Sequence, residues 1–273
     1  MGEGKEDIRD DIWILGPCAI EDRETYIETA GLLNEFMEGK NWYFKGSFDK
    51  ANRTSVHGKR GVGLEKAVEL FEAVRDEYPG IKLTTDVHET HQVKQLKDHI
   101  DIIQVPAFLC RQTDLLVECG RYFDVVNIKK GQWMNPQNIT HSAEKSRHKN
   151  KKAEVWLTER GTFFGYNKLT VDFSSVPVFK KAFDKVILDC THSTQFIEYG
   201  FTLGDRNLAE RYMISSRLFG YDGVFAETHP EPENAITDGK CMIYLDRIKA
   251  LINMHEKINE TYNKEIKSLI QKK

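Results

Sequence analysis

The feature that most constrains the fold of this chain is a regular alternation of short β-branched or aromatic runs with longer amphipathic stretches. This alternation is typical of βα units. Eight runs predict strands, at residues 12–16, 42–45, 82–86, 102–104, 125–129, 155–158, 186–189 and 223–226. The stretches between and after them predict helices that include residues 23–38, 64–78, 113–122, 204–219 and 244–263. Because no Gly/Ser-rich or Pro-rich linker interrupts the series, we predict one α/β domain over residues 1–273, a single (β/α)8 TIM barrel.

The composition narrows the class of partner. The 273 residues carry a formal net charge of -3, so any anion site must be local rather than a general basic surface. No apolar run reaches the roughly 18 residues that a membrane-spanning helix needs, and the first residues do not resemble a secretory signal. We therefore expect a soluble, cytoplasmic protein with neither nucleic acid nor a membrane as partner. Five cysteines without a CxxC pair argue against a disulfide scaffold, so each thiol is expected to be reduced.

The segment at residues 44–55 combines three cations with hydroxyl and amide groups. Lys45 ends a predicted strand, Lys50 and Arg53 follow it, and their neighbours are too small or too polar to build a core. Such a segment can bind a phosphate or a carboxylate. A solvated basic loop explains the same pattern equally well.

Polar residues recur where the chain leaves each predicted strand. In a closed barrel these ends converge on one face, where barrel enzymes keep their active sites. The alternative is that strands commonly end in polar residues because they meet solvent. In chain order the residues are Cys18, Lys45, Asp86, Gln104, Lys129, Arg160, His192 and Glu227.

Two other patterns allow a functional and an ordinary interpretation. Asp86, His88 and His91 have an Asp-x-His-x-x-His spacing that could supply metal ligands, but we interpret the histidines as loop or capping residues at a helix entry. The Lys/His-rich run at residues 141–152 is interpreted as a solvated helix and turn, because it lacks interleaved aromatic residues that would stack on bases.

Several motifs, in order and spacing, resemble those of the 3-deoxy-D-manno-octulosonate 8-phosphate synthases. The resemblance covers nearly the whole chain. The Lys-Ala-Asn-Arg sequence at residues 50–53 favours the octulosonate branch over the related 3-deoxy-heptulosonate 7-phosphate synthases. The motifs are Lys50-Ala-Asn-Arg-Thr-Ser55, Thr85-Asp-Val-His-Glu89, Gln104-Val-Pro-Ala-Phe-Leu109, Arg111-Gln-Thr-Asp114, Asn127-Ile-Lys-Lys130, Glu159-Arg-Gly161, Phe164-Gly-Tyr166 and Glu227-Thr-His-Pro-Glu-Pro232.

The resemblance implies condensation of phosphoenolpyruvate with D-arabinose 5-phosphate and water, with release of inorganic phosphate. Both substrates are anions, which calls for several fixed cations. Matching by motif, the residues on the phosphoenolpyruvate side are Lys45, Ser47, Gln104, Lys129 and Arg160, and Gln132 is a further substrate-binding residue. Those on the sugar phosphate side are Lys50, Asn52 and Arg53, with Asp86 accepting from a sugar hydroxyl or orienting Lys50.

The resemblance also implies a divalent metal. The family has a metal-dependent class with a cysteine after the first strand and a metal-independent class with asparagine there, and this chain has Cys18. The other matching ligands are His192, Glu227 and Asp238, a mixed set that suits Zn²⁺, Fe²⁺ or Mn²⁺. Without the resemblance, Cys18 would be interpreted as a small buried residue. In the implied chemistry the metal or its water orients and polarises the sugar aldehyde; the alternative is that the metal mainly positions groups. Lys50, His192 and Asp86 are the implied catalytic residues.

The oligomeric state is implied by the resemblance alone. A homotetramer is expected, in which Arg111 reaches the phosphate pocket of a neighbouring subunit; an ordinary arginine at a helix start is the alternative. The family's role lies in lipopolysaccharide biosynthesis.

The chain departs from the family pattern at two places. Gly131 stands where a proline is common, and residues 201–207 replace a Gly-Gly-Arg-Arg-like loop, with only Arg206 as a counterpart. These departures leave open a different aldose phosphate. They also leave two alternatives, an enzyme of the heptulosonate branch and a catalytically silent barrel that binds sugar phosphates.

Overall fold

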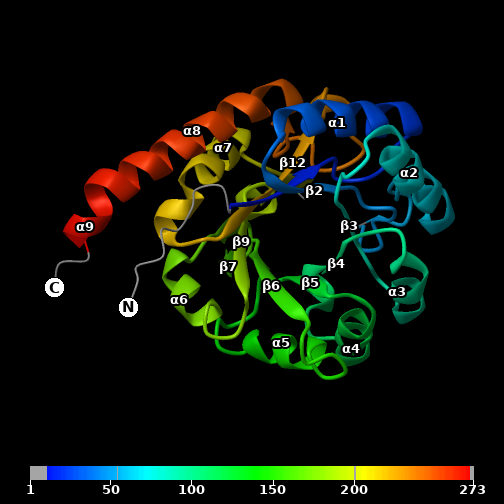
Figure 1. Cartoon of the computed structure of the whole chain (residues 1–273), viewed down its shortest axis with the longest axis horizontal. Helices are drawn as coiled ribbons and strands as arrows, with labels where there is room; N and C mark the ends of the chain where they lie inside the picture. Colours follow the sequence, from blue (N-terminus) through cyan, green and yellow to red (C-terminus); the bar gives the residue numbers. More distant parts are fainter. Residues whose placement is uncertain (1–10, 54, 200, 271–273) are drawn as a thin grey trace.

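A computed structural model describes residues 11–53, 55–199 and 201–270 (Figure 1). The N-terminal segment at residues 1–7, which carried the expectation of no secretory signal, lies outside the described residues. Within the described ranges, parallel strands form a closed barrel and helices surround it (Figure 1). The predicted (β/α)8 barrel is confirmed.

The barrel strands follow the chain order, as successive βα units require. Each strand pairs in parallel with the next, and the last pairs with the first, so that Ile12 lies opposite Gly223 and Gly16 opposite Glu227. The eight strands are β1 (Ile12–Gly16), β2 (Asn41–Lys45), β3 (Leu83–Asp86), β4 (Ile102–Val105), β5 (Val125–Lys129), β6 (Glu154–Glu159), β9 (Lys185–Asp189) and β12 (Gly223–His229). Every predicted strand overlaps one of them.

Strand β12 is longer than predicted because a further strand pairs with its last residues. Thr228 lies opposite Ile243, and His229 opposite Tyr244, in the parallel strand β13 (Ile243–Tyr244). The predicted helix at 244–263 is therefore wrong at its start. Tyr244 belongs to this strand, a 3-10 turn follows at Leu245–Arg247, and helix α8 (Ile248–Thr261) begins after it.

Helices cover the outside of the barrel, and the far end of α8 extends beyond it (Figure 1). Helix α7 is shorter than the predicted 204–219, because Asp205 caps its start by accepting from Leu208 N at 3.0 Å and its last turn is the 3-10 segment Ser216–Phe219. Besides α8, the helices are α1 (Arg23–Phe36), α2 (Leu64–Glu77), α3 (Thr90–Leu96), α4 (Thr113–Tyr122), α5 (Thr140–Ser146), α6 (Val176–Phe179), α7 (Arg206–Ser215) and α9 (Lys267–Ile270). Helix α5 and the turn after it confirm the interpretation of residues 141–152.

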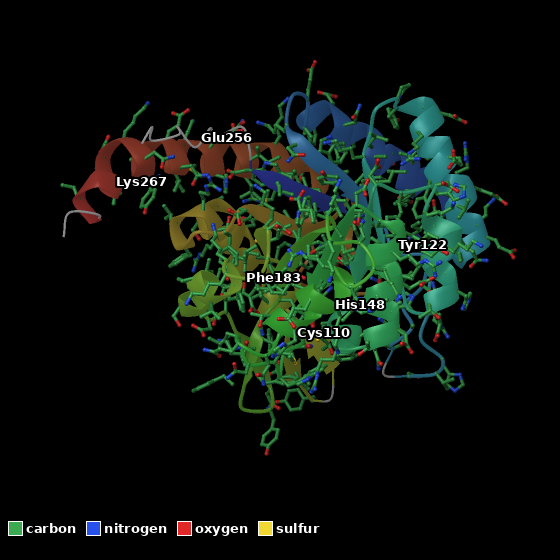
Figure 2. All side chains as sticks on the ribbon, turned by 60° about the horizontal axis from the view of Figure 1, so that its bottom comes forward. Cys110, Tyr122, His148, Phe183, Glu256 and Lys267 are labelled. Carbon is green, nitrogen blue, oxygen red and sulfur yellow. The ribbon has the colours of Figure 1, made fainter. Side chains whose placement is uncertain are left out.

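Apolar side chains pack in two regions, one on each side of the barrel wall. The outer core lies between strands and helices, where Figure 2 shows the side chains filling the space. The inner core fills the barrel itself, with Trp156 edge-on to Tyr43 at a centroid distance of 5.6 Å. The barrel is thus a packed scaffold whose open face carries the polar strand ends.

A small antiparallel sheet, which the sequence analysis did not predict, lies beyond the ends of two barrel strands. Its strands are β7 (Thr162–Phe164), β8 (Lys168–Thr170), β10 (Phe196–Glu198) and β11 (Phe201–Leu203). The first two strands follow β6 and the other two follow β9, so two hairpins join above the carboxyl end of the barrel. The altered 201–207 segment is therefore partly a strand of this sheet.

The cysteines are in the state that the composition predicts. All five cysteines are buried and none forms a disulfide, as expected. No helix in the described ranges is long and apolar enough to cross a bilayer.

Candidate active site at the carboxyl end of the barrel

The polar strand ends turn inward rather than toward solvent. Lys45, Gln104 and Glu227 are only 2%, 3% and 1% exposed. Burying such groups is costly unless each gains a partner, yet several of their atoms have none: Oε1 of Gln104, both carboxylate oxygens of Glu227 and Nη1 of Arg160 lack any hydrogen bond. Solvated strand ends do not explain this arrangement, whereas a ligand site does.

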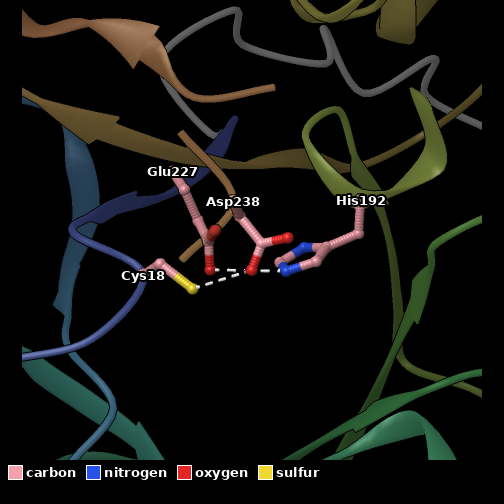
Figure 3. A group of neighbouring side chains, drawn as sticks. All are labelled: Cys18, His192, Glu227 and Asp238. Atoms are coloured by element: carbon pink, nitrogen blue, oxygen red, sulfur yellow. Dashed lines mark hydrogen bonds and ion pairs between the residues drawn. The ribbon is translucent and has the colours of Figure 1, made fainter. Parts of the chain in front are cut away.

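Four side chains predicted as metal ligands converge at this face. The ligand atoms of Cys18, His192, Glu227 and Asp238 all lie within 4.8 Å of one another (Figure 3). Cys18 Sγ is 3.3 Å from Asp238 Oδ2, and His192 Nε2 is 3.5 Å from Glu227 Oε1. Thiolate, imidazole and carboxylate are all ligands of divalent transition metals. The donor set and the unpartnered oxygens of Glu227 therefore fit a divalent metal ion.

Backbone conformation brings Asp238 into this cluster. Its φ of +58° lies in the left-handed region, which is costly for most residues and tolerated best by asparagine and aspartate. Burial opposes ionisation, but His192, Lys50 and hydrogen bonds from Thr237 and Cys18 lower the pKa of Asp238 to about 2. The carboxylate is thus ionised at neutral pH.

The thiol of Cys18, unlike the carboxyl of Asp238, favours its protonated form. Burial and the neighbouring Glu227 carboxylate raise its pKa well above the ordinary value. Without a cation the side chain is a neutral thiol that donates to Asp238. A bound metal ion would replace this proton.

Asp189, which the sequence analysis did not select, fixes the ring of His192. Its Oδ2 lies 2.8 Å from His192 Nδ1 and 2.7 Å from Lys129 Nζ, while Oδ1 accepts from the backbone N–H groups of Thr191 and His192 at 3.1 and 2.8 Å. Despite burial, His192, Lys129 and Arg160 hold the pKa of Asp189 below its usual range. A carboxylate only accepts, so Nδ1 carries the proton and Nε2 presents a lone pair to the cluster.

The predicted cations lie beside the cluster of candidate metal ligands: Lys45 Nζ is 3.2 Å from Cys18 O, and Lys129 Nζ is 3.5 Å from His192 Nδ1. Lys129 Nζ is 3.4 Å from the ring centroid of Phe225, and Lys45 Nζ is 6.0 Å from the same ring. Ser47 Oγ accepts from Lys45 and, at 2.9 Å, from Lys50. The two lysines from β2 and its following loop are therefore held together by one hydroxyl.

Lys50 and Asp86 carry complementary charges at this site. Burial alone lowers the pKa of Lys50, but Cys18, Asp86, Glu227 and Asp238 raise it above its ordinary value. Burial raises the pKa of Asp86, but Lys45, His88 and Lys50 bring it well below its ordinary value. A protonated ammonium therefore faces an ionised carboxylate.

The Asp-x-His-x-x-His pattern forms no metal group. Among the described residues, the cluster above is the only set of three or more potential ligands close enough to share an ion. His88 Nε2 lies 3.2 Å from Asp86, while His91 is exposed on α3. Glu89 and Gln92 form a capping box at the start of this helix, and the Gln92 side chain also accepts from His88 N. The prediction is confirmed for His88, which lies in the loop before the helix, but His91 lies within α3, and Glu89 and Gln92 rather than either histidine form the cap.

Of four further predicted substrate residues, three are exposed and one is buried. Asn52 and Arg53 are exposed, although Arg53 Nη1 reaches Thr237 Oγ1 at 2.6 Å. Arg111 is exposed as well. Gln132 is buried, and its Oε1 has no hydrogen-bond partner.

The two departures from the family pattern have structural explanations. An ideal Cβ at Gly131 would lie 3.1 Å from the Trp133 ring and 3.2 Å from Cys110 Sγ, so these side chains occupy the room of a larger residue. Arg206 donates to Met242 O at 2.6 Å and Gly239 O at 2.8 Å. Its guanidinium fastens α7 to the segment that contains Asp238.

Fold and site together define a class, a (β/α)8 barrel with buried cations beside a cluster suited to a divalent metal. A family model described as "DAHP synthetase I family" matches residues 5–264, and the chain belongs to this family. A protein of Wolinella succinogenes is 43% identical over 256 residues, which cover 89% of this chain and 97% of the relative. A Helicobacter hepaticus protein is 42% identical, with 92% and 97% covered, and a Campylobacter jejuni protein 41%, with 89% and 94% covered.

All three relatives are named 2-dehydro-3-deoxyphosphooctonate aldolase. This is another name for 3-deoxy-D-manno-octulosonate 8-phosphate synthase. The resemblance predicted from the motifs is confirmed.

Proposed function

We propose that the protein is an enzyme that condenses phosphoenolpyruvate with D-arabinose 5-phosphate and water, giving 3-deoxy-D-manno-octulosonate 8-phosphate and inorganic phosphate. Its membership in the family and the names of its relatives support the reaction. The observation that carries the assignment is the convergence of Cys18, His192, Glu227 and Asp238 beside buried lysines at one barrel end. The chemistry also fits a cytoplasmic enzyme of lipopolysaccharide biosynthesis.

The phosphoenolpyruvate side is assigned to the cations deepest in the barrel mouth. Lys45 and Lys129 hold the carboxylate, and Arg160, whose buried Nη1 has no partner, holds the phosphate. The planar guanidinium suits two phosphate oxygens at once. Ser47 supplies a hydroxyl, and Gln104 and Gln132 supply amide N–H groups, as hydrogen-bond donors to these anionic oxygens.

The sugar phosphate side is assigned to the loop after β2. Arg53 holds the phosphate and Asn52 bonds along the open-chain pentose. In the reaction, C3 of phosphoenolpyruvate bonds to the aldehyde carbon, water adds to C2, and the C2–O bond to phosphate breaks. The aldehyde oxygen becomes a hydroxyl and needs a proton.

Lys50 is assigned as the donor of that proton or hydrogen bond. Its raised pKa keeps it protonated, so it donates a charged hydrogen bond to the forming hydroxyl and cannot serve as a base. Asp86 orients it or accepts from a sugar hydroxyl. The structure favours His192 as a ligand over a proton carrier, since Nδ1 is engaged by Asp189 and Nε2 faces the cluster.

Cys18, His192, Glu227 and Asp238 would hold Zn²⁺, Fe²⁺ or Mn²⁺. Such an ion supplies orientation and polarisation of the sugar aldehyde. Removing it with a chelator is expected to abolish phosphate release from the two substrates, and adding back each ion separately ranks the metals. Full activity in metal-free protein would contradict this role.

Two assays separate the alternatives. Parallel reactions with arabinose 5-phosphate and erythrose 4-phosphate are expected to favour the pentose; the opposite preference would support the heptulosonate branch. Phosphoenolpyruvate binding without turnover on any aldose phosphate would support a silent barrel.

The assembly proposed for this chain is a homotetramer in which Arg111 serves a neighbouring site. Arg111 is exposed, and close to it Phe108 and Trp133 are about half exposed with ring centroids 5.9 Å apart. Exposed aromatic pairs are typical of surfaces that pack against another chain.

A further inference from the structure

Asp238 accepts hydrogen bonds on both carboxylate oxygens from side chains that themselves hold arginines. Gln195 Nε2 donates to Oδ1 at 2.6 Å, and its own Oε1 accepts from Arg160 Nη2 at 2.7 Å. Thr237 Oγ1 donates to Oδ2 at 2.8 Å and accepts from Arg53 Nη1 at 2.6 Å. Two hydrogen-bond chains, each of two bonds in series, thus connect two arginines to one carboxylate.

The direction of each chain follows from chemistry. A guanidinium has only donors and a carboxylate only acceptors. The oxygen of the Gln195 amide must therefore face Arg160, and its nitrogen must face Asp238. Thr237 has one proton, and because Arg53 donates to its oxygen, that proton goes to Asp238. Neither side chain can reverse while both of its partners remain in place.

Each chain joins a different substrate group to the same predicted metal ligand. Arg160 and Arg53 are the residues assigned above to the phosphates of phosphoenolpyruvate and of the sugar, so this step rests on the proposed function. Hydrogen bonds in series polarise one another. A phosphate that draws Arg160 or Arg53 toward itself alters the bond to Gln195 or Thr237 and, through it, the carboxylate of Asp238.

We propose that Gln195 and Thr237 are positioning residues that couple metal binding at Asp238 to phosphate binding, Gln195 for phosphoenolpyruvate and Thr237 for the sugar phosphate. Outer hydrogen-bond partners of metal ligands commonly change metal affinity about 10–100-fold. Coupling between two sites is reciprocal, so each substrate changes the affinity for the metal by the factor by which the metal changes the affinity for that substrate. The two couplings run through separate side chains and can be removed one at a time.

The test titrates Zn²⁺ by calorimetry into the metal-free full-length protein, alone, with phosphoenolpyruvate and with arabinose 5-phosphate. In the natural chain each substrate is expected to change the Zn²⁺ affinity by about fivefold or more. Gln195→Met keeps the length of the side chain but removes both hydrogen bonds, and it is expected to abolish the phosphoenolpyruvate effect alone. Thr237→Val is expected to reduce the sugar phosphate effect alone, leaving the part that comes from the ion polarising the aldehyde, whereas Thr237→Ser, which retains the hydroxyl, preserves the whole effect.

The outcomes separate this inference from the proposed function. If the natural protein binds both substrates but the variants keep both couplings, or lose both together, the proposed coupling through Gln195 and Thr237 is wrong. A general structural defect would lower stability and both couplings equally, and so would also count against it. If the natural chain binds neither substrate, the proposed function fails and the inference fails with it.

Discussion

The carboxylate of Asp189 lies 2.8 Å from Nδ1 of His192 and fixes which ring nitrogen faces the candidate metal ligands. We predict that Asp189→Asn lowers the affinity for Zn²⁺ by about 10–100-fold. The two backbone N–H groups at Oδ1 require an oxygen there, so the new amide N–H₂ would face His192 Nδ1 and Lys129. The histidine would then have to protonate Nε2, which removes the lone pair that faces the cluster.

Calorimetric titration of the metal-free variant measures this effect. Asp222→Asn is the matched control, since Asp222 accepts from Val186 N at 2.9 Å on the same strand β9, away from the cluster. The control is expected to lose stability but to bind Zn²⁺ normally. An Asp189→Asn variant with unchanged affinity would show that the tautomer is fixed by another group.

The barrel could be predicted from the sequence because its strands are regular apolar runs with helices between them. The small antiparallel sheet could not, because its four strands have three residues each and lie in polar and aromatic stretches without a clear alternation. Strand β12 was predicted too short because its last residues pair with β13, a strand that follows after a loop and has only two residues.

The four candidate ligands were predicted through the family motifs and the cations from the basic segment and the strand ends, and the structure brings the four candidate ligands together. Asp189, Gln195 and Thr237 were missed although each lies within three residues of a predicted ligand. Their roles depend on the direction of a side chain across the barrel mouth. Sequence spacing carries no information on that direction, but a polar residue this close to a ligand is a signal worth testing.

The affinity for metal is expected to rise with pH through the thiol of Cys18. Its pKa is raised by burial and by Glu227, so near neutral pH the free protein holds the thiol proton, which the metal must displace. Release of one proton raises the apparent affinity about tenfold per pH unit until the pH reaches that pKa. Zn²⁺ titrations between pH 7 and 9 measure the slope. In Cys18→Ser, which has no comparable proton to release, the slope should be much smaller; an equal slope would assign the proton elsewhere.

Arg160→Lys is expected to weaken phosphoenolpyruvate binding by about 10–100-fold, since charge-assisted hydrogen bonds contribute about 1.5–3 kcal/mol and lysine cannot span two phosphate oxygens. Arg160 is buried, and one of its terminal nitrogens is free of hydrogen bonds. The binding constant is measured directly by calorimetry. Arg121→Lys is the control, because Arg121 is exposed on the outer helix α4 beside Glu118. Equal affinities in the two variants would exclude Arg160 from the phosphate site.

Gly120→Ala tests the packing of α4 against α5. A Cβ at this position would lie 1.7 Å from Ser146 O, so the helices must separate. We expect the free energy of unfolding to fall by about 1–3 kcal/mol, as for other overpacked sites. Denaturant titration gives the value. In the control Gly39→Ala, φ is +72° but no atom lies within 4 Å, so about 1 kcal/mol of backbone strain is expected alone. If the two losses are equal, steric overlap at Gly120 is relieved without cost.

The proposed cross-subunit role of Arg111 is tested by mixing two inactive variants. Arg111→Ala removes the residue given to the neighbour, and Lys129→Met removes a cation within the subunit's own site. If Arg111 acts across a reciprocal interface, a hybrid pair contains one site with both defects and one with neither. Equal amounts that exchange subunits at random should regain about a quarter of the natural activity. Because each variant alone is inactive, phosphate release after mixing reports the hybrids directly. A mixture that stays inactive, although the subunits are shown by mass to have exchanged, would assign Arg111 to its own subunit or to the surface.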